Sequence, residues 1–369
     1  MKMDFFMPTM LISGRNCVIN NSSMLCGLGR KCLIITGGSS AKKSGALDDL
    51  VCALEKEGTA HDVFTSIEPN PLISSCHSAG VMARETGADF IAGIGGGSVL
   101  DASKAIAIYV ANGDLKDEDI YKREYTKSPL PVVLIGTTSG TGSEVTGVSV
   151  LTRDDNGRKK SISGADCYAR LSFLDAKYTH SLPFDATAST ALDALAHTVE
   201  GWFGPRMNET AKLFAVKAMH LLWGNIKFLG KEKCLPDEKQ REELYFGSIY
   251  AGLVINSCGT GFPHPLGYVL TEGFNVPHGK ACAAFMPKFL ERAEKFEPEK
   301  LNELLETVSE TRESFSAAVS LLEDLHGIKI SRQEAFEYAK RWDKIPKNFE
   351  ASPGGLTQQE AAEILAEVF

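Results

Sequence analysis

Four residues in the middle of the chain have types and spacing that could bind a divalent metal. Asp193 and His197 lie four residues apart in ATASTALDALAHTVEGW, a segment typical of a helix. That spacing places both side chains on one helix face, with Cβ atoms about 6 Å apart. His264 and His278 follow in FPHPLG and NVPHG. One carboxylate and several imidazoles suit Fe(II) or Zn(II), whereas calcium prefers oxygen ligands.

If the four residues converge, they hold a Lewis acid, and an open coordination position would make the site catalytic. The spacing alone leaves a second interpretation open. An Asp–His pair on one helix face often forms without a metal, and His264 or His278 could be a hydrogen-bonded loop residue among the neighbouring Pro and Gly. Other motifs must decide between the two.

Length and composition restrict the class of protein. The 369 residues are enough for two domains with their own cores, and a net charge of −8 without a basic stripe argues against nucleic-acid binding. No apolar stretch is long enough for a membrane helix or a signal peptide. Nine irregularly spaced cysteines, without a CxxC, favour reduced thiols. We therefore expect a soluble, cytoplasmic protein.

The elements that must position these residues change character near residue 180. Strands are expected at 31–36, 61–64, 90–93 and 132–135, and helices at about 44–57, 71–86 and 99–111. Their alternation predicts a mostly parallel, helix-covered sheet. Segments 148–152 and 158–163, joined by DDNG, are typical of a hairpin.

Almost everything beyond residue 180 is typical of helices, with Ser181 expected as an N-cap and Pro183 as an early helical residue. We expect an α/β domain over residues 1–180 and an all-helical domain over 181–369. A ligand would bind at the carboxyl ends of the strands.

Two loops at predicted strand ends could bind phosphates. Gly95, Gly96, Gly97 and Ser98 follow the third strand and open a helix, where glycine lets the backbone approach a pyrophosphate and the helix N-terminus supplies N–H donors. This is not the GxGxxG pattern, and a tight turn without a ligand would also use glycine. The loop 136–146 contributes the hydroxyls of Thr137, Thr138, Ser139, Thr141 and Ser143. Such hydroxyls also serve as helix caps, but two loops of this kind on one sheet edge favour a dinucleotide.

The end of the first strand favours NADP over NAD. Sites for NAD commonly place an acidic residue against the ribose 2′-hydroxyl. Here the strand is followed by small donors, without a carboxylate, and then by two cations: Gly37, Gly38, Ser39, Ser40, Lys42 and Lys43. These residues could receive a 2′-phosphate, although the two lysines could also be solvated charges at a helix start.

With these motifs the chain resembles the iron-containing alcohol dehydrogenase family over essentially its whole length. The matching segments are, in order, ITGGSSAKKSG, IEPNP, GIGGGSVLDASKAIA, GTTSGTGSEVT, DALAHTVEGW and HPLGY…NVPHG. Several independent motifs in the right order make this resemblance specific. The first two look most like the NADPH-dependent butanol and aldehyde reductase branch.

The resemblance implies a Rossmann-like dinucleotide-binding domain, an all-helical domain and a metal between them, in a dehydroquinate synthase-like architecture. It implies metal ligation by Asp193, His197, His264 and His278. It implies cofactor contacts at Gly95, Gly96, Gly97, Ser98, Asp101, Asn70, Thr137, Thr138, Thr141 and Lys160. It also implies a homodimer or larger homo-oligomer.

One position departs from the family pattern. Many members carry a further histidine four residues after the third ligand, and this chain has Tyr268 there. We expect His278 and Tyr268 as the catalytic residues, with Tyr268 either a substitute proton donor or a wall of the pocket.

These expectations combine into reversible hydride transfer between NAD(P)(H) and a primary alcohol or aldehyde, with Fe(II) or Zn(II) as Lewis acid. A glycerol-, polyol- or phosphate-substrate dehydrogenase of the same fold is the nearest alternative. A metal hydrolase and a non-catalytic nucleotide sensor are more distant ones.

Overall fold

The computed structural model describes residues 3–325 and 327–369, and the chain forms two compact units. One unit, here called the α/β unit, consists of Met7–Thr138 and Gly142–Leu182. The other, the helical unit, consists of Pro183–Phe369, the short segment Ser139–Thr141 and an N-terminal stretch ending at Phe6. The sequence analysis placed the whole of loop 136–146, here called the hydroxyl-rich loop, in the first domain, whereas Ser139–Thr141 belongs to the helical unit.

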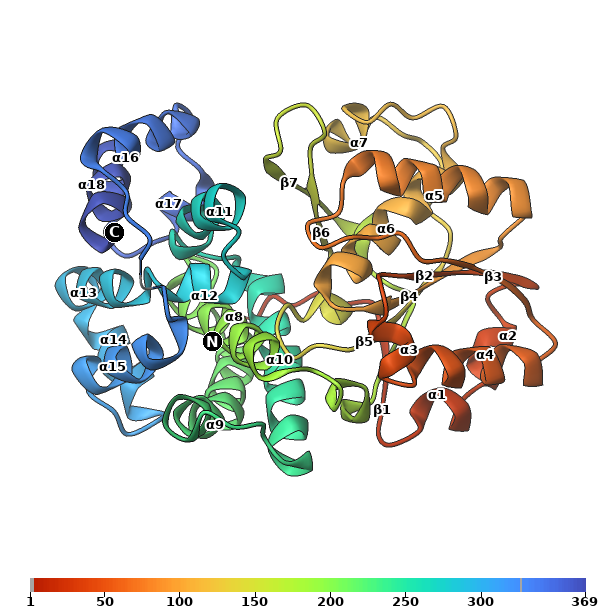
Figure 1. Ribbon diagram of the computed structural model, residues 1–369, viewed down its shortest axis with the longest axis horizontal. Coiled ribbons are helices and arrows are strands. Elements are labelled where there is room, and N and C mark those ends of the chain that lie inside the picture. The colour runs from red at the N-terminus through yellow and green to blue at the C-terminus, as the bar shows by residue number, and fades with distance from the viewer. Residues whose placement is uncertain (1–2, 326) are drawn as a thin grey trace. The chain divides into compact units, whose positions relative to one another are not determined.

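The α/β unit is built on a six-stranded parallel sheet with the order β1-β8-β5-β4-β2-β3. Figure 1 shows β2 beside β3 and β4 in this sheet. Its strands are β1 (Met10–Ser13), β2 (Lys31–Thr36), β3 (Ala60–Phe64), β4 (Phe90–Gly95), β5 (Val132–Gly136) and β8 (Leu171–Leu174). The predicted parallel sheet is confirmed. The sequence analysis missed the short strands β1 and β8, which add one edge of the sheet.

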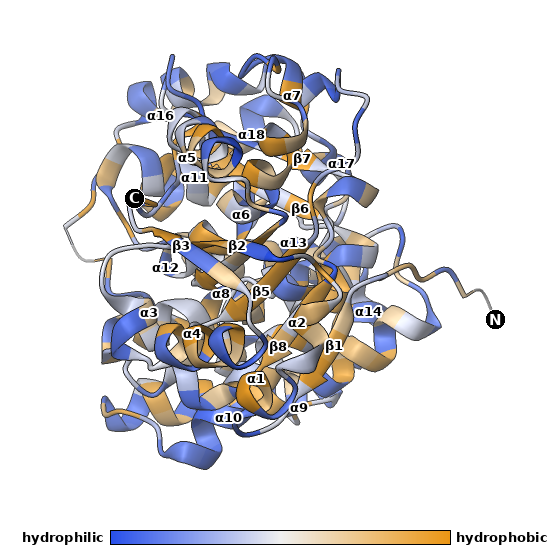
Figure 2. Cartoon of the chain, turned by 90° about the vertical axis from the view of Figure 1, so that its right-hand side faces the viewer, coloured by the Kyte–Doolittle hydropathy of each residue, from blue (hydrophilic) through white to orange (hydrophobic). Residues whose placement is uncertain are grey.

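Helices cover both faces of this sheet because its strands alternate their side chains between two hydrophobic clusters. Leu33 and Ile35 of β2 face a cluster with α5 (Ile73–Thr86) and α6 (Gly97–Ala111). Ile34 of the same strand faces a cluster with α1 (Cys17–Asn20) and α4 (Ala46–Lys56). Strands buried on both faces are mostly hydrophobic, as the colouring of β5 and β8 shows (Figure 2).

A two-stranded antiparallel hairpin follows β5, as predicted, with β6 (Val148–Thr152) and β7 (Lys159–Ser163). Shorter elements complete the α/β unit: α2 (Ser23–Cys26), α3 (Ser40–Lys43), α7 (Asp119–Lys122), and the 3-10 turns Ser143–Val145, Ala165–Cys167 and Ala176–Thr179.

The helical unit begins with three long helices, α8 (Phe184–Phe203), α9 (Glu209–Glu232) and α10 (Glu238–Cys258). It continues through α11 (Pro263–Phe274), α12 (His278–Ala283), α13 (Met286–Phe296), α14 (Pro298–Glu306), α15 (Arg312–Glu323), α16 (Arg332–Ala339), the 3-10 turn Lys340–Trp342, α17 (Lys347–Glu350) and α18 (Gln358–Val368). The predicted Ser181 cap is wrong. Pro183 occupies the N-cap position of α8 and makes no side-chain cap bond, because its side chain carries no hydrogen-bond acceptor.

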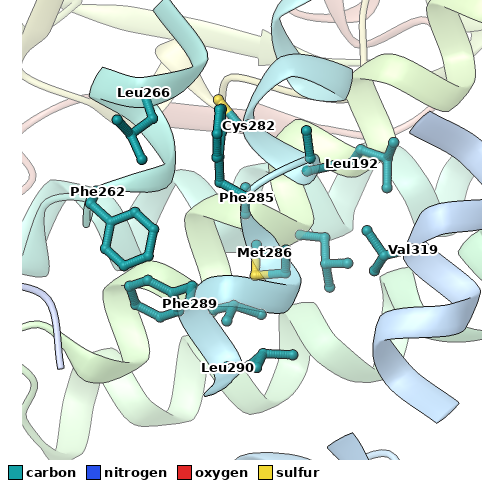
Figure 3. Close-up of a cluster of buried hydrophobic side chains, with 14 of the residues drawn as sticks. Leu192, Phe262, Leu266, Cys282, Phe285, Met286, Phe289, Leu290 and Val319 are labelled. Atoms are coloured by element: carbon teal, nitrogen blue, oxygen red, sulfur yellow. The ribbon is translucent and has the colours of Figure 1, made fainter. Parts of the chain in front are cut away.

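The core of the helical unit lies where α8, α11, α12 and α13 meet. Figure 3 shows part of it, with Phe262, Phe285 and Phe289 packed beside Met286, and Cys282 at the edge of the drawn cluster. Within the described part of the chain, no helix has the length and apolar character that a membrane crossing requires.

Candidate metal centre and nucleotide loops

The structure brings the four predicted metal ligands together around one carboxylate oxygen. Asp193 Oδ1 lies 3.7 Å from His197 Nε2, 3.8 Å from His264 Nε2 and 3.8 Å from His278 Nε2. Asp193, His197 and His264 are buried, and the His278 side chain is 27 % exposed. The His197 and His264 rings stack with centroids 4.8 Å apart. Three imidazoles therefore surround a single buried carboxylate.

Three helices of the helical unit supply these ligands. Asp193 and His197 lie one turn apart on α8, which is buried over most of its circumference. His264 lies in the first turn of α11 after Pro263, and His278 is the first residue of α12. Both histidines thus lie in helices, although the surrounding Pro and Gly left a loop position open.

Glycine allows α12 to lie directly against α8. A Cβ atom on Gly279 would lie 1.7 Å from the carbonyl oxygen of Ser189, so no larger residue fits there without moving the helix. Because Gly279 follows His278 in sequence, this close approach carries the His278 ring to Asp193. The Gly in NVPHG is therefore a packing requirement of the site.

Glu200 orients one of the histidines, and the sequence analysis did not single it out. His264 Nδ1 lies 2.7 Å from Glu200 Oε1, and Gly261 N donates to Glu200 Oε2 at 2.8 Å. A hydrogen bond from Nδ1 to the carboxylate leaves Nε2 of His264 directed at the Asp193 side, the arrangement that commonly orients metal-ligating histidines. Burial raises the pKa of Glu200, and the neighbouring His264 opposes this shift. Glu200 lies three residues after His197 on the same helix, and this spacing could have identified it from the sequence as a neighbour of the site.

The electrostatics of the centre suit a cation. Among the described residues no donor bonds Asp193 Oδ1, although this oxygen is buried. A buried carboxylate oxygen without a partner is costly, and a metal ion would satisfy it. Burial lowers the pKa of His197 to about 4, so this imidazole stays neutral and can donate an electron pair to a metal. The donor set thus fits Fe(II) or Zn(II).

Two further side chains lie against His278. The Tyr268 ring stacks on the His278 ring with centroids 5.4 Å apart and an interplanar angle of 20°. Cys282 Sγ lies 3.7 Å from both ring nitrogens of His278. The sequence singled out Tyr268 and His278 as candidate catalytic residues, and their rings are in contact. Cys282 was not predicted, although its position four residues after His278 on α12 was visible in the sequence.

In the α/β unit, the predicted phosphate loops lie at the carboxyl ends of neighbouring strands. Gly37–Ser40 follows β2 and Gly95–Ser98 follows β4, and the strand order reverses between these two strands. Ligands of such sheets bind at this reversal point. A Cβ on Gly37 would lie 2.5 Å from the Ile67 carbonyl oxygen, and one on Gly96 would lie 2.9 Å from the Thr138 side chain. These glycines therefore also have structural roles.

The remaining predicted cofactor residues are distributed over both units. Asn70 lies next to the second loop, where its N–H donates to Ser98 Oγ at 3.2 Å, and it adopts the left-handed conformation that asparagine tolerates. Thr137 and Thr138 follow β5 in the α/β unit, whereas Thr141 belongs to the helical unit. Lys160 is exposed on β7 and stacks over the Tyr121 ring.

Asp101 takes part in a buried network instead of facing an open loop. Its Oδ1 accepts a hydrogen bond from Ser143 Oγ at 2.5 Å, and its Oδ2 accepts one from Val150 N at 2.9 Å. Lys104, one helical turn later, is 1 % exposed and donates to Ser143 Oγ and to the Val148 carbonyl oxygen, both at 2.7 Å. The network joins α6, which begins at the glycine loop, to the segment after the hydroxyl-rich loop. The sequence analysis did not single out Lys104, although its position three residues after Asp101 on a predicted helix indicated that the two charges could pair.

Comparison with known proteins assigns this architecture. The profile described as "Iron-containing alcohol dehydrogenase" matches residues 8–176, and that of the "Fe-containing alcohol dehydrogenase family, C-terminal" matches residues 187–334. The chain is 30% identical to a 1,3-propanediol dehydrogenase of Citrobacter freundii, over 88% of this chain and 84% of that protein. It is 29% identical to the probable alcohol dehydrogenase EutG of Escherichia coli, over 78% of this chain and 72% of that protein.

Solved structures agree. An iron-containing alcohol dehydrogenase of Thermotoga maritima is similar with a TM-score of 0.90 and 32% identity, covering 99% of each chain. The predicted combination of a Rossmann-like domain and a helical domain is confirmed. The chain belongs to the iron-containing alcohol dehydrogenase family and is an NAD(P)-dependent oxidoreductase of alcohols and aldehydes.

Proposed function

We propose that this chain interconverts a primary alcohol and its aldehyde with NADP(H) as the preferred cofactor, at an Fe(II) centre held by Asp193, His197, His264 and His278. The observation that carries the proposal is the convergence of three imidazoles on the buried, otherwise unsatisfied Asp193 Oδ1. Zn(II) fits the same donors, so metal supply also decides occupancy.

When bound, the metal would supply Lewis acidity that stabilises negative charge on the oxygen of the substrate, and the nicotinamide would accept hydride from the alcohol or give it to the aldehyde. The protein's own residues prepare the site. Glu200 holds the His264 tautomer, and the low pKa of His197 keeps that ring neutral. Tyr268 stacks on His278, which places an aromatic wall and a phenol group beside the ligands. A proton-donor role for Tyr268 stays part of the proposal.

The preference for NADP rests on the loop after β2. From Thr36 to Gly45 the chain carries no carboxylate, and Ser39, Ser40, Lys42 and Lys43 are exposed. A 2′-phosphate would find hydroxyl donors and two cations there, and no like charge. Gly95–Ser98 at the start of α6 would bind the pyrophosphate, and Asn70, Asp101, Thr137, Thr138, Thr141 and Lys160 would support the cofactor as the family resemblance implies.

The likeness to alcohol and propanediol dehydrogenases favours small, unphosphorylated alcohols over the phosphate-substrate alternative. We propose that the protein acts in the cytoplasm as a homodimer or larger homo-oligomer. Gel filtration with light scattering measures the oligomer directly.

The decisive experiment compares an aldehyde and alcohol panel with NADPH and NADH, using protein reconstituted with each metal. Replacing His264 with Ala should abolish stoichiometric metal binding and turnover. His220→Ala, at an exposed histidine on α9 of the same unit, should change neither. Full activity of metal-free His264→Ala protein would refute the proposed mechanism, and equal or better use of NADH would refute the cofactor preference.

A further inference from the structure

A sulfur atom lies inside the proposed metal centre. Cys282 Sγ is 3.7 Å from the ring nitrogens of His278, one turn earlier on α12. One ligand atom from each of Asp193, His264, His278 and Cys282 can be chosen so that all four lie within 4.8 Å of one another. This group shares Asp193, His264 and His278 with the four predicted ligands. It contains Cys282 in the place of His197.

Packing alone explains part of this position. Cys282 is fully buried, belongs to the hydrophobic core of the helical unit, and lies at the edge of the cluster in Figure 3. Its sulfur fills the space beside Gly267, where a Cβ would lie 3.1 Å from Sγ. A small apolar residue would serve that packing role equally well, so packing by itself does not require sulfur.

An independent observation points to a ligand at the same place. Asp193 Oδ1 is buried and has no hydrogen-bond donor among the described residues, and a carboxylate oxygen of Asp193 lies within 4.8 Å of Cys282 Sγ. Zinc binds sulfur at about 2.3 Å and nitrogen at about 2.0–2.1 Å, so neighbouring S and N donors of one ion lie about 3–3.5 Å apart. The observed 3.7 Å between Sγ and the nitrogens of His278 is close to that separation.

We propose that Cys282 Sγ is a ligand of this metal centre, in addition to the aspartate and histidines. This inference rests on the proposed metal site and adds a donor to it. The thiol binds as thiolate and releases one proton to solvent for each metal ion bound. Because thiolate is a softer donor than carboxylate or imidazole, it shifts the preference of the centre from Fe(II) towards Zn(II).

Cobalt(II) reports the sulfur bond without reference to activity. Wild-type protein, Cys282→Ser and the control Cys258→Ser are reduced, stripped of metal and titrated with cobalt under anaerobic conditions. Cys258 is a buried cysteine of the same unit at the end of α10. We expect a near-ultraviolet sulfur-to-cobalt charge-transfer band in wild type and in Cys258→Ser. In Cys282→Ser the band should vanish while stoichiometric cobalt still binds.

Failure of the inference and failure of the metal site give different results. Cobalt binding to wild type without the band, or with a band that persists in Cys282→Ser, overturns the role of Cys282 and leaves the proposed metal site intact. Absence of cobalt binding to wild type overturns both. Chelator competition should show about tenfold or more weaker Zn(II) binding in Cys282→Ser, with a smaller change for Fe(II). Equal losses for the two metals would refute the proposed preference.

X-ray absorption of the wild-type zinc protein covers the case in which Cys282→Ser fails to fold. We expect a sulfur neighbour of zinc at about 2.3 Å, and a shell of nitrogen and oxygen alone would overturn the assignment.

Discussion

Lys104 provides the sharpest stability test of the α/β unit. The Lys104 side chain is 1 % exposed. Its ammonium group donates to Ser143 Oγ at 2.7 Å, to the Thr146 carbonyl oxygen at 3.0 Å and to the Val148 carbonyl oxygen at 2.7 Å. It also lies 3.5 Å from Asp101 Oδ1. Burial lowers the pKa of Lys104, and Asp101 opposes this shift. The substitution Lys104→Met keeps much of the side-chain volume and removes the charge and all three donors.

The expected loss of stability in Lys104→Met comes from the buried groups that no longer have Lys104 as a partner. The Asp101 carboxylate loses its ion-pair partner, and the Thr146 and Val148 carbonyl oxygens lose a donor, in a place where little water enters. Removing one partner of a buried ion pair typically costs about 3–5 kcal/mol. The same substitution at Lys31, whose ion pair with Asp62 is about one-third exposed, should cost less than about 1 kcal/mol. We therefore predict that Lys104→Met lowers the free energy of unfolding several times more than Lys31→Met.

Hydrogen exchange measured by mass spectrometry is the suitable assay. All three tryptophans lie in the helical unit, so fluorescence would not report on the α/β unit. For amides of α6 that exchange through unfolding, a loss of about 3–5 kcal/mol accelerates exchange by about a hundred-fold to several thousand-fold, since each 1.4 kcal/mol is a factor of ten. If NADPH binds as proposed, its Michaelis constant should rise more than kcat falls, because the network joins α6 to the segment that follows loop 136–146. A loss in Lys104→Met no larger than that in Lys31→Met would refute this reasoning.

Three further perturbations test other parts of the structure. Glu200→Gln removes the charge that orients His264 and should weaken metal binding about 10–100-fold in chelator competition, and an unchanged affinity would exclude the orienting role. Gly279→Ala places a methyl group against the backbone of α8, so we expect lower thermal stability and a lower metal content, and wild-type values for both would contradict the close packing. The Lys227 hydrogen bond lowers the pKa of Glu310 from 4.5 to about 2, so this carboxylate stabilises the fold above pH 4.5 and the contribution is lost as the pH falls towards 2. Acid unfolding followed by circular dichroism should be less steep in that window for Glu310→Gln, and an identical acid transition would rule out the contribution.

Local sequence patterns predicted the elements that depend on nearby residues. The apolar run Lys31–Thr36 predicted a central strand, and the Asp193–His197 spacing on a helix predicted one ligand pair, because both depend only on backbone periodicity. The weak strands β1 and β8 were missed, since strands of four residues carry little pattern and are stabilised by pairing with distant segments.

The residues that complete the site could not be ranked from the sequence. Glu200, Cys282 and Lys104 are ordinary helix residues until their partners are known, and each partner comes from another element. Likewise, nothing local shows that Ser139–Thr141 packs with the helical unit although its neighbours belong to the α/β unit.

The sequence by itself determined the family, the order of the elements and the four residues able to bind a metal, because these depend on residue types and on spacing along the chain. The tertiary structure alone decided that His264 and His278 meet Asp193, because their approach depends on how closely α11 and α12 pack against α8. It also placed a carboxylate behind one ligand and a sulfur beside another. Such contacts are set by the distances between helices, which the spacing of residues within one helix does not contain.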